Sequence, residues 1–206
     1  MPFITVSRMY GSGGSQVAAR VAQALGWELF DNAVVDAVAQ RTGMSRAEVS
    51  ARDERVPSMV ERLAATLSLA TPESMPAIPD APLPTEERLV EFTKRVIEDA
   101  VLRGPAVFVG RGAQCLLAER ADALHVFCYA PRAFLVEYAI QHWHIAPNDA
   151  ERHVTDMNKQ REQYVKRHWN RRWLEPENYH LWLNTGWLGI EGAADVVIDV
   201  ARRRFG

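Results

Sequence analysis

Cysteine is scarce in this chain, and its positions exclude two common kinds of site. The 206 residues include only Cys115 and Cys128, with no CxxC pair and no His-rich stretch beside either. This spacing argues against a disulfide framework and against a zinc site. Because reduced thiols are the rule in the cytoplasm, we expect a cytoplasmic protein.

Long apolar runs and an excess of one charge sign are also lacking. No apolar run approaches the roughly 18–20 residues of a membrane helix, and the first residues do not resemble a signal peptide. The chain has 24 Lys and Arg against 26 Asp and Glu, so it lacks the basic excess of a general nucleic-acid binder. We expect neither a membrane span nor a nucleic-acid partner, and the composition leaves a homo-oligomer open.

Short apolar segments alternate with amphipathic ones along the chain. Five segments are expected to form strands, namely 3–6, 27–30, 105–109, 124–129 and 181–183. None alternates strictly between apolar and polar residues, which is typical of parallel strands with helices on both faces. This order predicts a single α/β domain over residues 1–206, built as a doubly wound parallel sheet flanked by helices.

Amphipathic periodicity and capping residues predict the helices. They are expected at about 17–25, 32–40, 45 onward, 56–67, 85–103, 131–144, 148–173 and 190–204, with Ser45, Thr85 and Asn148 as N-caps and Gly26 as a C-terminal stop. Five prolines within 71–84 predict a loop, because proline neither continues a helix nor sits inside a sheet. A mobile surface loop and a lid or partner-binding segment both fit this stretch.

A glycine-rich segment joins the first strand to the first helix. Its residues are Gly11, Ser12, Gly13, Gly14 and Ser15. Backbone N–H groups in such a turn can converge on a phosphate, beside the positive end of the helix. The turn also follows the carboxyl end of its strand, where open α/β sheets bind ligands. A structural turn without a ligand is the alternative.

The segment matches the Walker pattern G-x-x-x-x-G-K-[ST] in part. Gly13 and Ser15 stand at the expected positions, but Arg8 replaces the first glycine and Gly14 replaces the lysine. Arg8 begins the loop, and a guanidinium there could take over the phosphate contacts of the missing lysine.

Several blocks of the sequence resemble, in order, the cytidylate kinase-like P-loop proteins, which are relatives of the nucleoside monophosphate kinases. The blocks are the loop region 4–14, the strand end 29–31, the Gly-Arg turn 107–112, the strand 178–185 and the helix start 188–191. The loop resembles the variant phosphate loop of that family, in which the usual lysine is missing. The resemblance implies a P-loop NTPase-like fold with a helical lid.

The resemblance also implies an activity. The family transfers the γ-phosphoryl group of ATP, with Mg²⁺, to a nucleoside monophosphate, and cytidylate is the first acceptor to test. Residues 11–15 would bind ATP, and Ser15, at the Walker Ser/Thr position, would be the magnesium ligand.

Four charged residues receive roles from the same resemblance. Arg8 and Arg161 would be catalytic, since phosphoryl transfer depends on positioning and on neutralising phosphate charge. Asp31 and Arg111 would bind the acceptor, although Asp31 also fits an N-cap of the helix that follows it. Arg161 lies in a basic segment at about 147–175 that would form the lid, with a solvated charged face and RNA binding as the alternatives.

Departures from the family's pattern favour a second interpretation. Gly14 stands in place of the lysine, Val109 and Gly112 stand where acids are expected, and Ala37 stands where a phosphate-binding arginine is expected. A nucleotide-binding regulatory protein that lacks phosphoryl transfer would also have these features.

Overall fold

The computed structural model describes residues 1–31 and 86–206. Met1–Phe30 and Val96–Gly206 form one compact unit, and Asp31–Arg95 form a second. The single domain over 1–206 stays a prediction. Several expected features lie outside the described residues, namely the helices at 32–40, 45 onward and 56–67, the proline-rich loop 71–84 and the Thr85 cap.

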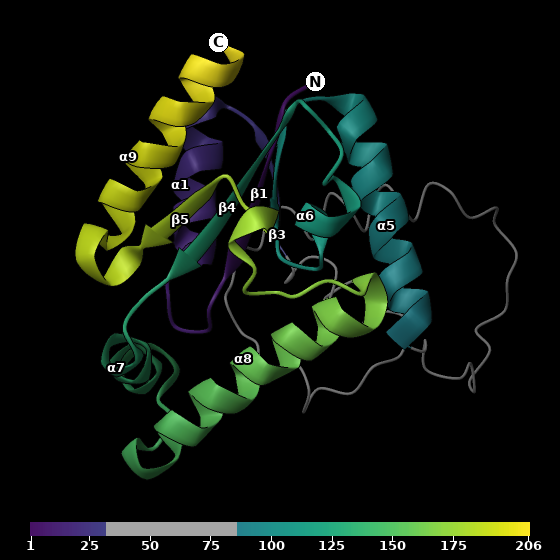
Figure 1. Cartoon of the computed structure of the whole chain (residues 1–206). Helices are drawn as coiled ribbons and strands as arrows, with labels where there is room; N and C mark the ends of the chain where they lie inside the picture. Colours follow the sequence, from purple (N-terminus) through teal and green to yellow (C-terminus); the bar gives the residue numbers. More distant parts are fainter. Residues whose placement is uncertain (32–85) are drawn as a thin grey trace, which may run out of the picture. The chain divides into compact units, whose positions relative to one another are not determined.

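Five parallel strands form the sheet of the first unit, in the order β2-β3-β1-β4-β5 (Figure 1). They are β1 (Phe3–Arg8), β2 (Glu28–Phe30), β3 (Ala106–Val109), β4 (Ala123–Tyr129) and β5 (Leu181–Asn184). All five predicted strands are present, and the parallel α/β architecture is confirmed. β1 pairs with both β3 and β4 and extends two residues past its expected end, so Arg8 is its last residue.

One face of the sheet is covered by α1 (Gly14–Leu25) and α9 (Thr185–Phe205). The apolar stripe of α1 includes Val17 and Val21, which pack with Ile4 of β1 and Val197 of α9 in a fully buried cluster. Gly26 ends α1 with φ at 67°, a left-handed conformation that favours glycine, as predicted.

The opposite face is packed partly by chain outside regular helices. Phe127 of β4 contacts Trp173 and Tyr179, which lie between α8 (Pro147–Trp169) and β5. The other helices are α5 (Glu86–Arg103), α6 (Ala113–Leu116), α7 (Arg132–Trp143) and the 3₁₀ helix η1 (Pro176–Asn178). In the part of the chain that the structure describes, no helix combines the length and apolar character of a membrane span.

The bounds of α8 and α9 differ from those expected. Asn148 does not cap α8, because Pro147 occupies its first turn, where proline is favoured, and Ala146 is the N-cap. α8 ends at Trp169 rather than near Trp173, because Asn170 adopts a left-handed conformation with φ at 51°. α9 begins at Thr185 rather than at residue 190, since a kink at Gly189 joins an extra turn to the predicted helix.

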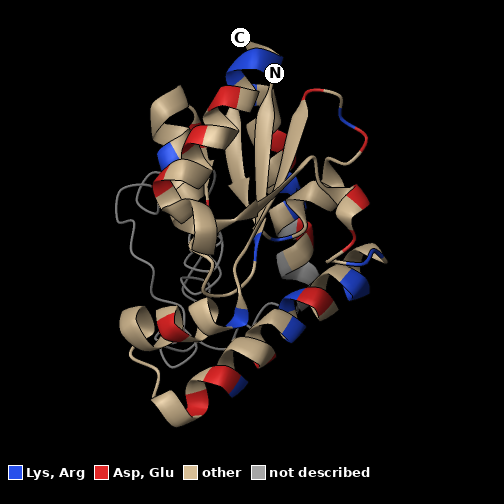
Figure 2. Cartoon of the chain, turned by 60° about the vertical axis from the view of Figure 1, so that its left-hand side comes forward, with Lys and Arg blue, Asp and Glu red and all other residues tan. Residues whose placement is uncertain are grey.

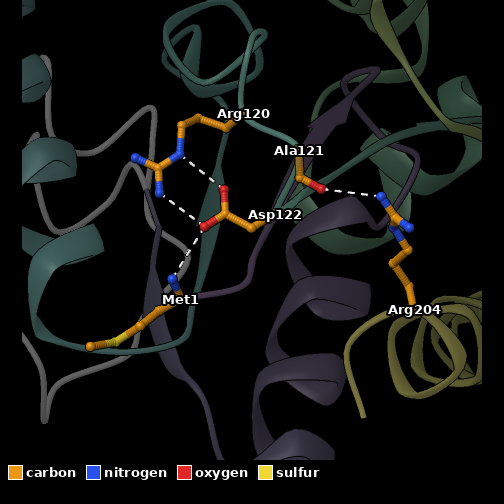
Figure 3. Close-up of polar contacts among 5 residues, drawn as sticks. All are labelled: Met1, Arg120, Ala121, Asp122 and Arg204. Carbon is orange, nitrogen blue, oxygen red and sulfur yellow. Dashed lines mark hydrogen bonds and ion pairs between the residues drawn. The ribbon is translucent and has the colours of Figure 1, made fainter.

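Polar contacts join the chain segments at the amino ends of β1 and β4 (Figure 3). Asp122 accepts a hydrogen bond from the Met1 ammonium group at 3.2 Å and two from Arg120 at 2.9 Å. Arg204 of α9 donates to the carbonyl oxygen of Ala121 at 3.3 Å. The Arg120 guanidinium also lies 5.0 Å from the centre of the Phe3 ring. These contacts are exposed to solvent, so each contributes little to stability.

A buried histidine lies within the sheet. The Nδ1 atom of His125, in β4, is 2.8 Å from the hydroxyl oxygen of Thr5, in β1, and its ring stacks on His180 with the ring centres 5.0 Å apart. Burial, followed by the nearby charge of His180, lowers the pKa of His125 from 6.5 to about 4. The folded protein therefore prefers the neutral imidazole.

This preference makes stability depend on pH. The unfolded chain takes up a proton at His125 near pH 6.5, whereas the folded chain does so only near pH 4, so protonation favours unfolding. We expect His125 to contribute a loss of about 3 kcal/mol in the free energy of unfolding as the pH falls across this window. Denaturant titrations at several pH values should show a smaller loss for His125→Gln than for the wild type. His142→Gln, at an exposed position, is the control, and an unchanged pH profile in His125→Gln contradicts the prediction.

Candidate functional site

The glycine-rich loop connects the end of β1 to the start of α1. Gly13 is the N-cap of α1 in a left-handed conformation with φ at 69°, without a side-chain cap, and the first turn of α1 carries no acidic residue. The first N–H groups of a helix have no partner within that helix, and they carry the positive end of its dipole. This geometry suits an anion at residues 11–15.

Close packing explains the glycines of the loop. A Cβ atom on Gly11 would lie 2.8 Å from the carbonyl oxygen of Leu135 in α7. A Cβ atom on Gly13 would overlap the side chain of Ile190, the residue that follows the α9 kink. The loop is thus held between α7 and α9, with no room for side chains at these positions.

Gly14 packs directly against Arg8. A Cβ atom at residue 14 would overlap the Cβ atom of Arg8 and lie 2.9 Å from its Cγ atom. The first methylene groups of Arg8 therefore fill the space that a side chain at the Walker lysine position would need. The Arg8 side chain is therefore adjacent to the lysine position in space, and its role in place of the lysine stays a prediction.

The two serines of the loop occupy different environments. Ser12 is fully buried, and its hydroxyl donates to the carbonyl oxygen of Met9 at 2.9 Å, which stabilises the turn. Ser15 is half-buried in the first turn of α1, beside the helix N-terminus. Of the two side chains, Ser15 is therefore better placed to bind a metal ion.

A second turn with unusual backbone follows β3. Gly110, Arg111 and Gly112 have φ values of 70°, 52° and 73°, and Arg111 is one of the few described residues other than glycine in this region. Burial lowers the pKa of Arg111, the charge of Arg8 acts in the same direction, and Tyr164 opposes both. A half-buried arginine with a left-handed backbone and a charge that interacts with that of another arginine is typical of a functional site.

α8 lies over both turns. Its Asn158 accepts a hydrogen bond from the Tyr10 amide at 2.7 Å, and its Arg161 donates to the carbonyl oxygen of Arg8 at 2.7 Å. Trp169 packs on Gly112, where a Cβ atom would overlap the indole. Figure 2 shows acidic as well as basic residues along α8, so the helix is mixed in charge.

The structure brings most of the predicted site residues together. Arg8, the loop 11–15 and Arg161 are joined by the contacts above, and Arg111 lies 5.9 Å from the centre of the Tyr164 ring of α8. Asp31 is half-buried directly after β2, and because it belongs to the second unit its role stays a prediction.

The region around α8 differs from the sequence prediction at three residues. Arg172 falls within the helix expected at about 148–173, but it lies beyond the end of α8 at Trp169. Asn158 was missed, although it stands three residues before Arg161, a spacing that places both on one face. Tyr10 was recognised only as part of the loop motif, whereas its amide also donates a hydrogen bond to Asn158 of α8.

Comparison with known proteins agrees with this geometry. The model of a family described as the cytidylate kinase-like family matches residues 3–186. No curated protein matches the chain.

Several solved structures have a similar fold. An uncharacterized protein from Eubacterium ventriosum is 16% identical with a TM-score of 0.68, and the alignment covers 98% of this chain and 99% of that one. Shikimate kinase from Bacteroides thetaiotaomicron is 12% identical with a TM-score of 0.52, covering 98% of both chains. A gluconokinase from Sinorhizobium meliloti is 14% identical with a TM-score of 0.51, covering 98% and 94%. These similarities confirm the P-loop kinase fold.

The packing at Gly14 generates a stability prediction. Gly14→Ala should lower the free energy of unfolding by about 1–3 kcal/mol, because the new methyl group displaces Arg8 in a packed site. Gly104→Ala is the matched control, since a Cβ atom there meets nothing within 4 Å. Denaturant unfolding of both variants tests this, and equal stability of the two would show that the loop tolerates a side chain at residue 14.

Proposed function

The chain belongs to the cytidylate kinase-like family, and from this we propose that it transfers the γ-phosphoryl group of ATP to a nucleoside monophosphate, with cytidylate as the preferred acceptor. Family and fold support a nucleotide kinase-like phosphotransferase with a small-molecule acceptor. The choice of cytidylate rests on the family resemblance.

The observation that carries the proposal is the grouping of three arginines around the glycine-rich loop. Arg8 comes from β1, Arg111 from the turn after β3 and Arg161 from α8. Arg161 donates to the backbone carbonyl of Arg8, and the Arg111 guanidinium lies 5.9 Å from the centre of the Tyr164 ring of α8. Phosphoryl transfer depends on neutralising phosphate charge, and guanidinium groups that lie close together can supply this neutralisation.

Each part of the site has a role in this proposal. Backbone N–H groups of residues 11–15 bind the ATP phosphates, and Arg8 acts in place of the missing lysine. Arg161 adds a second positive charge for the transferring group, while Arg111 and Asp31 bind the acceptor. Ser15 would hold magnesium through its hydroxyl oxygen, and the bound ion would help to neutralise phosphate charge.

A second candidate is a regulatory protein that binds nucleotide without transferring phosphate. The packing of Gly112 favours it, because the Trp169 indole leaves no space for an acid at that position. The absence of a lysine at Gly14 points the same way. The two candidates differ in one measurable property, acceptor-dependent turnover of ATP.

Nucleotide binding is the first property to test. ATP or ADP with magnesium should raise the melting temperature, because a ligand that binds only the folded state stabilises it. Gly13→Asp should abolish the shift by placing a carboxylate in the phosphate site.

Arg8→Ala should lose about 2–4 kcal/mol of transition-state stabilisation, read from kcat/KM. Arg152→Ala, an exposed arginine of α8, is the control, and an Arg8→Ala enzyme with unchanged kcat/KM removes Arg8 from the mechanism.

Acceptor specificity is the second property. ATP consumption should be measured with CMP, dCMP, UMP, AMP and GMP, and with shikimate and gluconate to represent the kinases of similar fold. We expect turnover with CMP above that with the other acceptors, and formation of CDP. If no nucleoside monophosphate supports turnover while ADP still raises the melting temperature, the regulatory candidate is correct.

A further inference from the structure

Tyr10 belongs to the phosphate loop by sequence, but its side chain packs between α7 and α8. It is 7% exposed and lies in a cluster with Leu135 and Ala139 of α7 and Val154 of α8. Its ring lies 4.2 Å from that of Trp143, centre to centre, and its hydroxyl is 3.2 Å from Nε2 of His153. α7 and α8 therefore pack around a residue of the loop.

Two backbone groups of the loop are held by side chains of one helix. The carbonyl oxygen of Arg8 accepts from Arg161, and the amide of Tyr10 donates to Asn158, each at 2.7 Å. These groups flank Met9, and their partners stand three residues apart, on one face of α8. The guanidinium of Arg161 also lies 5.6 Å from the centre of the Tyr10 ring. Tyr10, Asn158 and Arg161 are thus connected by these contacts.

The hydrogen bonds to Asn158 and Arg161 hold residues 8–10, which set the shape of the loop. Met9 and Tyr10 lead from β1 into the glycines, and the Met9 carbonyl accepts from the amide and hydroxyl of Ser12. Fixing residues 8–10 thus fixes the start of the turn that presents N–H groups to phosphate. Preorganised donors bind an anion more tightly than mobile ones, because less order is lost on binding.

We propose that Asn158 is a positioning residue of the phosphate loop. Through the Tyr10 amide it holds the loop in the conformation that receives nucleotide, so that docking of α8 and nucleotide binding favour each other. The second part of this statement rests on the proposed function, whereas the first does not. Asn158 suits the role because its amide oxygen accepts a hydrogen bond without placing a negative charge beside the phosphates.

The test compares three variants of the full chain. Asn158→Leu keeps the approximate size and removes the acceptor, Asn158→Asp keeps an acceptor, and Gln163→Leu is the matched control at an exposed position of α8. Hydrogen exchange of the Tyr10 amide is followed by NMR without nucleotide. Binding of ADP with magnesium is measured by calorimetry, together with KM for ATP, KM for the acceptor and kcat.

We expect faster exchange of the Tyr10 amide in Asn158→Leu, and protection close to wild type in Asn158→Asp and Gln163→Leu. The affinity of Asn158→Leu for ADP should fall about tenfold, and its KM for ATP should rise by a similar factor, with kcat and the acceptor KM little changed. A role in folding alone would not change the ADP affinity and the KM for ATP while leaving kcat and the acceptor KM in place. It would also not restore protection of the Tyr10 amide in Asn158→Asp.

Other outcomes have definite meanings. Unchanged Tyr10 exchange or unchanged ADP affinity in a folded Asn158→Leu protein overturns the proposal. If Asn158→Leu does not fold, loss of Tyr10 protection in Asn158→Asp overturns it instead. If the wild type binds no ADP, the proposed function is wrong. The exchange rate of the Tyr10 amide in the variants then tests by itself whether Asn158 holds the loop.

Discussion

The contact between Gly14 and the Arg8 side chain is the constraint on which the site depends. β1 and α1 are joined by only a few residues, and α1 approaches the end of β1 so closely that residue 14 has no room for a side chain. The same contact places the first methylene groups of the Arg8 side chain beside residue 14, the lysine position of a Walker loop. Loop shape, helix placement and the position of the first positive charge therefore follow from one steric requirement.

Much of the fold could be predicted because its determinants are local. Short apolar runs ended by glycine mark buried strands, and the stripe at Val17 and Val21 marks α1. The phosphate loop was recognisable because its glycines cluster between a strand and a helix. The bounds of α8 were missed, since Pro147 and Asn148 both suit a helix start and only the backbone shows which one is used.

The part of the site on α8 depends on contacts that sequence patterns do not contain. Asn158 and Tyr10 are 148 residues apart, and they meet only after α7 and α8 pack around Tyr10. The packing of Trp169 on Gly112 is similarly distant in sequence. A helical pattern can indicate which residues of α8 share a face, but the partner of that face comes from tertiary packing.

The fit of Trp169 on Gly112 has a consequence for how this site can evolve. An acid at residue 112 would need both a left-handed backbone, which favours glycine, and the space now filled by the indole. Either substitution alone is unfavourable, because a side chain at 112 collides with Trp169 and a smaller residue at 169 leaves a cavity. The two positions are therefore epistatic, and single-step mutation does not reach a site that carries an acid after Arg111.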